Sequence, residues 1–159
     1  MAGHPTFTSA LFYVNPRAAL NFLDRAFGFE LDMLLEDENG NLAHSQMVFG
    51  DGRIMVGAEW SDDHRSPQSV GHKCTQSIHV QLTDGLDAHC ERARAAGAEI
   101  VAEPETQFYG DRTYRARDPE GHIWTFSQTV EALTPQQWDT NSGLRTWMRN
   151  GSHEHGATG

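Results

Sequence analysis

The residues best suited to chemistry lie on one face of a short segment with β-strand periodicity, residues 75–83. Ser77, His79 and Gln81 occupy alternate positions, and the positions between them are apolar: Ile78, Val80 and Leu82. An imidazole changes protonation near neutral pH, so His79 is a candidate general acid or base. A neutral His79 hydrogen-bonded to Ser77 or Gln81 would serve equally well in binding alone. Exposure of this face to bulk solvent would also explain its polarity.

The remaining reactive groups form no second catalytic pair. Cys90 follows His89 within a helical pattern and is expected to be a packing or surface residue. The glycine-containing segment 50–52 is a hairpin turn with no helix behind it, so it does not predict a phosphate loop. Two cysteines, Cys74 and Cys90, are too few for a disulfide framework.

Composition restricts the partners. The chain has 159 residues and a formal net charge of −10, from 12 basic and 22 acidic residues. Nucleic acids and anionic membrane surfaces require a basic footprint, which this balance does not supply. No apolar run approaches the about 20 residues that span a bilayer. We therefore expect a soluble, cytoplasmic protein with a single core and no nucleic-acid or membrane partner.

Two stretches recur at the same distance along the chain. The segment 25–31 returns at 94–100, and the segment 51–54 returns at 120–123, each 69 residues later. Chance and the frequency of helix-ending glycines are the alternative explanation. Two matches at one offset favour two copies of one supersecondary unit. Two copies are too few for a solenoid, so we expect them to pack around a shared feature.

Each copy predicts the same order of elements, β-α-β-β-β. In the first copy we expect a strand over 7–14, a helix from Pro16 that ends at Gly28, and strands over 29–35, 42–49 and 53–60. In the second copy we expect a strand over 75–83, a helix over 86–96 that ends at Gly97, and strands near 98–103, 111–117 and 122–128.

The periodicity divides the chain into four parts. Residues 6–60 form the first βαβββ module and residues 74–130 the second, and the polar, aperiodic segment 61–73 links them. Residues 131–159 form a C-terminal tail that is expected to be partly disordered, although Trp138 and Trp147 suggest that part of it docks.

Paired βαβββ units that end in Asp118-Pro119-Glu120-Gly121-His122-Ile123-Trp124 resemble the vicinal oxygen chelate superfamily, the glyoxalase, bleomycin-resistance and extradiol-dioxygenase group. The segments 108–113 and 14–19 resemble its PhnB-like branch. The resemblance implies an α+β fold in which two βαβββ modules form a curled mixed sheet around a central cavity, with helices on the outside. It also implies frequent pairing of subunits, so we expect a homodimer. It does not define an activity, because the superfamily hosts isomerases, dioxygenases, transferases and binding proteins.

The resemblance allows a test for the metal site of the metal-using members, whose ligands lie on the first and last strand of each unit. The corresponding position on the last strand is Thr125, and the repeat offset carries it to Val56. On the first strands the positions are Ser77 and Ser9. None of these side chains is a good ligand for a divalent transition metal, so we expect the metal site to be lost and no cofactor to be bound.

A shifted ligand set is the alternative. His79, His44 and Glu59 would supply two imidazoles and one carboxylate to a divalent metal ion. Against this set, Glu59 has the opposite strand parity to Val56 and is expected to point toward the helices unless a bulge intervenes.

In the resembled fold the polar face of 75–83 meets the cavity, together with polar groups from neighbouring strands and apolar wall. We expect the ligand-binding residues to be Tyr13, His44, Gln46, Trp60, Ser77, Gln81, Tyr109, Arg112 and Thr125, with His79 as the catalytic candidate. Arg112 either forms a surface ion pair or holds an anionic ligand group. The expected partner is a small organic molecule, bound by sequestration or with weak acid/base chemistry. A metal-dependent lyase, isomerase or dioxygenase is the alternative, and whether the protein is an enzyme stays open.

Overall fold

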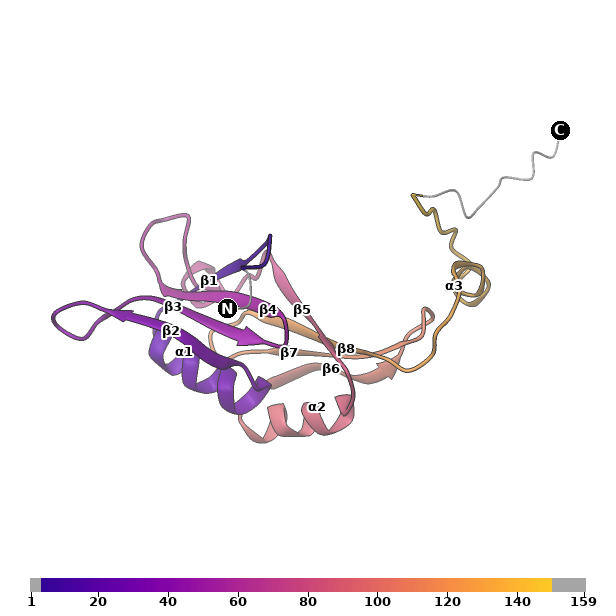
Figure 1. Cartoon of the computed structure of the whole chain (residues 1–159), viewed down its shortest axis with the longest axis horizontal. Helices are drawn as coiled ribbons and strands as arrows, with labels where there is room; N and C mark the ends of the chain where they lie inside the picture. Colours follow the sequence, from indigo (N-terminus) through magenta and orange to yellow (C-terminus); the bar gives the residue numbers. More distant parts are fainter. Residues whose placement is uncertain (1–3, 150–159) are drawn as a thin grey trace.

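The computed structural model describes residues 4–149, which fold into two βαβββ modules (Figure 1). The first module contains β1 Ser9–Tyr13, α1 Pro16–Phe22, η1 Leu23–Phe27, β2 Glu30–Glu36, β3 Leu42–Phe49 and β4 Gly52–Ala58. The linker contains the short helix η2 Pro67–Val70. The second module and tail contain β5 Ser77–Leu82, α2 Leu86–Ala95, β6 Glu99–Thr106, β7 Asp111–Arg117, β8 Ile123–Thr129 and α3 Pro135–Ser142. The predicted α+β fold of two βαβββ modules is confirmed.

Local signals set the bounds of the first helix. Pro16 stands in its first turn, and the Asn15 side chain accepts a hydrogen bond from the backbone N–H of Ala18. The helix continues as one wider π-turn and ends at Gly28, whose φ of 81° lies in the left-handed region. The residue pattern predicted both ends of this helix.

Each module has its own four-stranded mixed sheet, in the orders β1-β4-β3-β2 and β5-β8-β7-β6. In both sheets the first and last strands of the module pair in parallel, and the other pairs are antiparallel. The sheets do not close into a barrel. β1 and β5 are therefore edge strands, and each has a free side.

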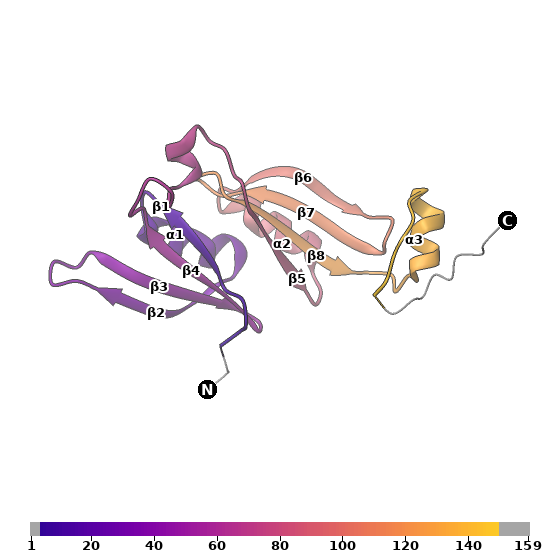
Figure 2. The ribbon, with the colours of Figure 1, turned by 90° about the horizontal axis from the view of Figure 1, so that it is seen from above.

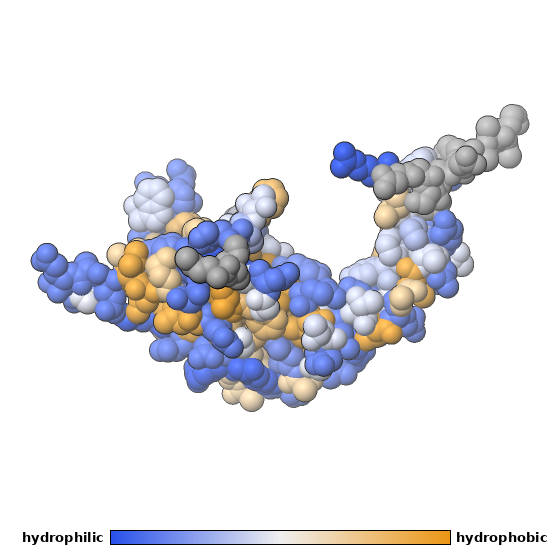
Figure 3. All heavy atoms as spheres, in the orientation of Figure 1, coloured by the Kyte–Doolittle hydropathy of each residue, from blue (hydrophilic) through white to orange (hydrophobic). Residues whose placement is uncertain are grey.

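Figures 1 and 2 show α1 and α2 on the same side of the two sheets, which leaves the opposite side uncovered by helices. We call this uncovered side the open face. The space-filling view shows it hollowed between the linker loop and α3 (Figure 3). Within residues 4–149 no helix has the length and apolar character needed to cross a membrane.

The hydrophobic core continues across the boundary between the modules. The ring of Phe27, at the end of η1, lies 5.4 Å from that of Trp124 and 4.8 Å from that of Phe126, both in β8. Both ring nitrogens of His89, in α2, form hydrogen bonds. Nδ1 lies 2.6 Å from the Tyr114 hydroxyl, and Nε2 lies 2.9 Å from the Phe27 carbonyl oxygen. Because a carbonyl only accepts, Nε2 carries the proton and Nδ1 accepts from Tyr114. Burial lowers the pKa of His89, which favours this neutral form.

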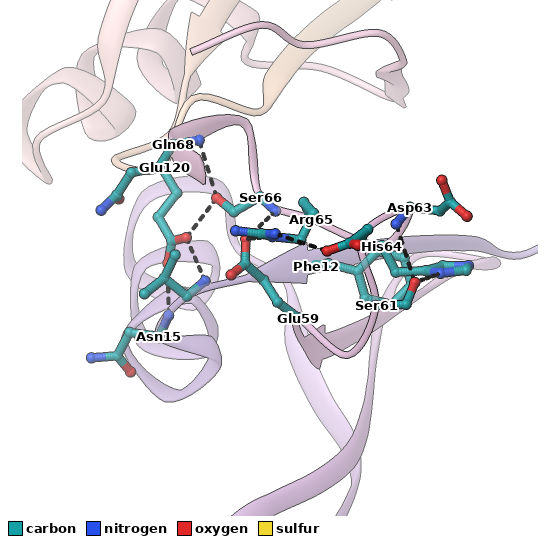
Figure 4. A network of polar contacts seen from close by, with 12 residues as sticks. Phe12, Asn15, Glu59, Ser61, Asp63, His64, Arg65, Ser66, Gln68 and Glu120 are labelled. Atoms are coloured by element: carbon teal, nitrogen blue, oxygen red, sulfur yellow. Dashed lines mark hydrogen bonds and ion pairs between the residues drawn. The ribbon is translucent and has the colours of Figure 1, made fainter. Parts of the chain in front are cut away.

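A buried polar cluster also joins the modules. Asp118 accepts hydrogen bonds from the Tyr13 hydroxyl at 2.7 Å and from the Trp124 indole at 3.2 Å. Glu120 accepts from the backbone N–H groups of Val14 and Asn15, at 2.6 and 3.0 Å. We call the side chains of this network the junction cluster, which consists of Tyr13, Ser66, Asp118, Glu120 and Trp124. Ser66 donates to Glu120 at 2.7 Å, so the linker is part of the same connection (Figure 4).

The described part of the tail docks on the end of the second module. The backbone N–H groups of Val130 and Glu131 both donate to the Gly110 carbonyl at 3.0 Å. The Asn141 side chain of α3 donates to the Phe108 carbonyl at 3.1 Å. The expectation of disorder for residues 150–159 lies outside the described residues.

Candidate functional site

A groove of about 460 Å³ runs along the free edge of β5, between this strand and the β3–β4 turn of the first module. We call it the β5 groove. Its polar lining includes Ser77, His79 and Gln81, all exposed. Its apolar lining includes Phe29, Phe49, Ile54, Ile78 and Val80. Ser9, Asp51 and Arg53 complete the polar lining. An apolar wall combined with converging polar groups is typical of small-molecule sites.

The open face of the second sheet carries the polar residues of β5, β8 and β7. The register places His79 opposite Thr125 and Thr125 opposite Arg115. The residues that alternate with them, Trp124 and Phe126, are fully buried toward α2. The sequence pattern thus identified the polar face of β5, and the structure brings Thr125 beside His79.

Two positions in the first module were misplaced: Val56, carried from Thr125 by the repeat offset, and Ser9, taken as the counterpart of Ser77. Val56 is fully buried, and Leu11, opposite it in β1, is only 5% exposed, so both belong to the face that packs under α1. The pair that corresponds to His79 and Thr125 on the open face is Ala10 and Met55. The inference that Ser9 and Val56 occupy the ligand corners is therefore wrong. Ala10 and Met55 lie 45 positions apart (55 − 10), whereas His79 and Thr125 lie 46 apart (125 − 79). A constant offset therefore misses the corresponding position in β4 by one residue, and a shift of one residue exchanges the faces of a strand.

The predicted ligand residue Tyr13 lies away from the β5 groove. It is 1% exposed beside α1, and its hydroxyl donates to Asp118 at 2.7 Å. Burial, and secondly the Asp118 carboxylate, raise the pKa of Tyr13 well above its usual value. Its role in the structure is to connect the modules.

Trp60 lies at the linker, outside the lining of the β5 groove. Its ring is 69% exposed and stacks on His64, with ring centroids 4.1 Å apart. His64 in turn meets the edge of Phe12 at 5.1 Å and accepts from or donates to Ser61 at 2.7 Å (Figure 4).

His44 and Gln46 belong to a polar network that crosses the first sheet. Gln46 Nε2 donates to His44 Nε2 at 3.2 Å, and Arg53 donates to Gln46 Oε1 at 2.6 Å. Arg53 also pairs with Asp32 at 3.0 Å and lines the β5 groove. Its Nε is buried without a hydrogen-bond partner among the described atoms. Sequence reasoning missed Arg53 and Asp32. The signal in the sequence that could have identified Arg53 is its place directly before the apolar residues of β4.

The two ligand-binding residues predicted near the β6–β7 turn, Tyr109 and Arg112, have different surroundings in the structure. Arg112 points toward α2, where its Nε donates to Asp87 at 2.9 Å, so the surface ion pair is the arrangement observed. Tyr109 is half-buried and packs edge-to-face on Phe108, with centroids 5.1 Å apart. Burial, and secondly Asp111, raise the pKa of Tyr109, and the charge of Arg115 opposes this shift.

The residues of the alternative metal set do not come together. Glu59 pairs with Arg65 at 3.2 Å and accepts from the backbone N–H of Ser66 at 2.8 Å (Figure 4). Hydrogen bonds from Ser69 and then Ser66 hold the pKa of Glu59 below its usual value. Over residues 4–149 no three His, Cys, Asp or Glu side chains lie close enough to bind one ion. The open-face pairs, Ala10 with Met55 and His79 with Thr125, supply a single good transition-metal ligand, so they do not fit a resident metal.

Cys90 offers no nucleophile to the site. It is a fully buried residue of α2, and burial raises the pKa of its thiol to about 11. A thiol with this pKa carries little thiolate near neutral pH, which agrees with the predicted packing role.

The two βαβββ modules, each with its own open four-stranded mixed sheet, are the fold of one superfamily. Residues 4–126 match the Glyoxalase/Bleomycin resistance protein/Dioxygenase superfamily, and the chain belongs to it. The finer PhnB-like placement stays a prediction.

Similar proteins agree with this membership. The crystal structure of TioX from Micromonospora sp. ML1 is 32% identical, with a TM-score of 0.66, and the match covers 80% of this chain and 100% of that chain. A superfamily member from Sphaerobacter thermophilus is 20% identical, with a TM-score of 0.63 over 80% of this chain and 99% of that chain, and supports the fold alone. An uncharacterized protein of Mycobacterium bovis is 29% identical over 138 residues, which cover 81% of this chain and 86% of the relative.

Proposed function

We propose that the protein binds a small organic molecule in the β5 groove and acts by sequestration, or by weak acid/base chemistry through His79. The observation that carries the proposal is the two-sided lining of the groove. Ser77, His79 and Gln81 present hydrogen-bonding groups beside the apolar side chains of Phe29 and Phe49. A volume of about 460 Å³ suits a molecule of small-drug size.

This function does not require a metal. His79 Nε2 or Nδ1 would form a hydrogen bond with the ligand or exchange a proton with it. Ser77 and Gln81, two residues to either side on the same face, would orient it. The apolar wall would exclude water from one side of the bound molecule.

We further propose that the protein is a cytoplasmic homodimer. Its two cysteines are unpaired, as is usual in a reducing compartment. β1 is an edge strand with a free side, which a second copy would cover. Light scattering tests the assembly, and a monomer mass across the working concentration range would contradict it.

His79→Ala is expected to weaken ligand binding about tenfold. The variant loses one hydrogen bond to the ligand in a partly desolvated site, and such a bond contributes about 1.4 kcal/mol to the binding free energy. The measurement is a titration with small heteroaromatic fragments, followed through backbone amide chemical shifts. Fragments that bind should shift the resonances of residues 77–81 and of the β3–β4 turn. His79→Gln should retain part of the binding and lose any proton-transfer activity.

His72→Asn is the matched control, because His72 is exposed, lies outside the groove lining and has a positive φ of 59° that asparagine tolerates. It should bind like the wild type. The proposal fails when no fragment perturbs residues 77–81, or when His79→Ala binds as tightly as His72→Asn.

A further inference from the structure

Three side chains form a row across the open face of the second sheet. His79 of β5 lies opposite Thr125 of β8, which lies opposite Arg115 of β7. Adjacent strands are about 4.8 Å apart, so the row spans about 10 Å. Arg115 Nε lies 3.4 Å from Thr125 Oγ1, so the guanidinium extends along the row toward His79. We call these three residues the β5–β8–β7 row.

Arg115 differs from its neighbours in having no carboxylate partner. Arg117, two residues further on the same face, pairs with both oxygens of Glu99 at 3.1 Å. Arg112, on the other face, pairs with Asp87. Among residues 4–149, no Asp or Glu oxygen lies within 4.0 Å of the Arg115 guanidinium.

The carboxylates on the same face are otherwise engaged or lie at its margin. Glu99 is held by Arg117, and Asp111 accepts from the Ser127 hydroxyl at 2.7 Å. Glu105 lies on the outer strand β6, opposite Thr113 and not in the row. The row therefore combines one free guanidinium, one hydroxyl and one imidazole, all of which can donate hydrogen bonds.

His79 belongs to both the row and the β5 groove. A ligand whose apolar part lies in the groove would have its polar end at His79, within about 10 Å of Arg115. A planar guanidinium binds carboxylate and phosphoryl oxygens through two parallel hydrogen bonds, and a neighbouring hydroxyl adds a third.

We propose that the β5–β8–β7 row is an anion subsite, which selects ligands that carry a carboxylate or phosphonate group next to an apolar body. This inference rests on the proposed function of the β5 groove and adds the chemical class of its ligand. Arg115 is the specificity-determining residue, and Thr125 and His79 complete the subsite.

The test compares four probes of similar size by amide chemical-shift titration: benzoate, phenylphosphonate, benzamide and benzylamine. Wild-type protein should bind at least one of the two anions at least about tenfold tighter than neutral benzamide, because a bidentate charged pair replaces a neutral contact. It should not bind the benzylamine cation measurably. Arg115→Gln should remove this preference, so that the affinity for the anions falls to the level of the affinity for benzamide. The order of benzoate and phenylphosphonate identifies the preferred anion.

Arg117→Gln is the matched control, because it removes a cation that Glu99 already neutralises, and it should retain the anion preference. Equal loss in both variants would show a general charge effect and overturn the subsite. If benzamide binds in the groove as tightly as both anions do, the anion subsite is overturned, but the proposed function of the groove is not. If none of the probes perturbs residues 77–81, the proposed function of the groove fails with it.

Discussion

Asp118→Ala is expected to lower the melting temperature by about 10 °C. Asp118 is 3% exposed and accepts four hydrogen bonds: from the Tyr13 hydroxyl, the Trp124 indole and the backbone N–H groups of Glu120 and His122. Alanine would leave these buried donors without an acceptor, at a cost of about 3–5 kcal/mol. For a chain of this size, each kcal/mol corresponds to about 2–4 °C. Differential scanning calorimetry measures the shift.

Two variants separate the lost acceptor from a general effect of removing charge. Asp84→Ala removes a carboxylate from an exposed turn and should change the melting temperature by less than about 2 °C. Tyr13→Phe deletes a single donor to Asp118 and should lower it by about 3 °C, since one net hydrogen bond contributes about 1 kcal/mol. An Asp118→Ala protein that melts like Asp84→Ala would contradict the role of the junction cluster.

The order and type of the elements could be predicted because their signals are local. Pro16 and Gly28 bound the first helix, and alternation along 75–83 defines β5 and its polar face. The β3 strand occupies the predicted residues 42–49. Such signals act over a few residues, so a repeated pattern predicts the same unit twice.

Positions carried from one module to the other were less secure. Val56 was matched to Thr125 by a constant offset, yet one faces α1 and the other faces the open side. The side-chain period of a strand is two residues, so an error of one residue between matched positions reverses the face. Matching Ser9 to Ser77 was also wrong by one residue, and it placed Tyr13, which shares a face with Ser9, in the ligand wall although Tyr13 lies in the core.

Contacts between the modules carried no local signal. Residues 118–121 were predicted as a turn, which they form, but nothing near them indicates that Asp118 meets Tyr13, 105 positions away. Within the first module, Arg53 of β4 and Asp32 of β2 meet across β3, and no local signal indicates this contact either. Arg115 is free of a carboxylate only because of which side chains surround it in the fold, and this cannot be derived from spacing.

Gly110→Ala is expected to lower the melting temperature by about 10 °C and to release the tail from the second module. Gly110 has a φ of 97°, and a Cβ at this position would lie 2.1 Å from the Glu131 carbonyl oxygen. That oxygen belongs to the backbone of the segment whose N–H groups bond to the Gly110 carbonyl, so it cannot move without breaking those bonds. Backbone strain of about 1–2 kcal/mol adds to the loss of the docked segment, for a total of about 3–4 kcal/mol.

Gly97→Ala isolates the strain from the clash. Gly97 has a similar φ of 101°, but a Cβ there would meet nothing within 4 Å. Its melting temperature should fall by about 3–6 °C, from strain alone. Amide hydrogen exchange of Val130 and Glu131 should accelerate in Gly110→Ala and stay unchanged in Gly97→Ala, because only the first displaces the tail. Equal melting temperatures and equal exchange in the two variants would mean that the tail does not dock at Gly110.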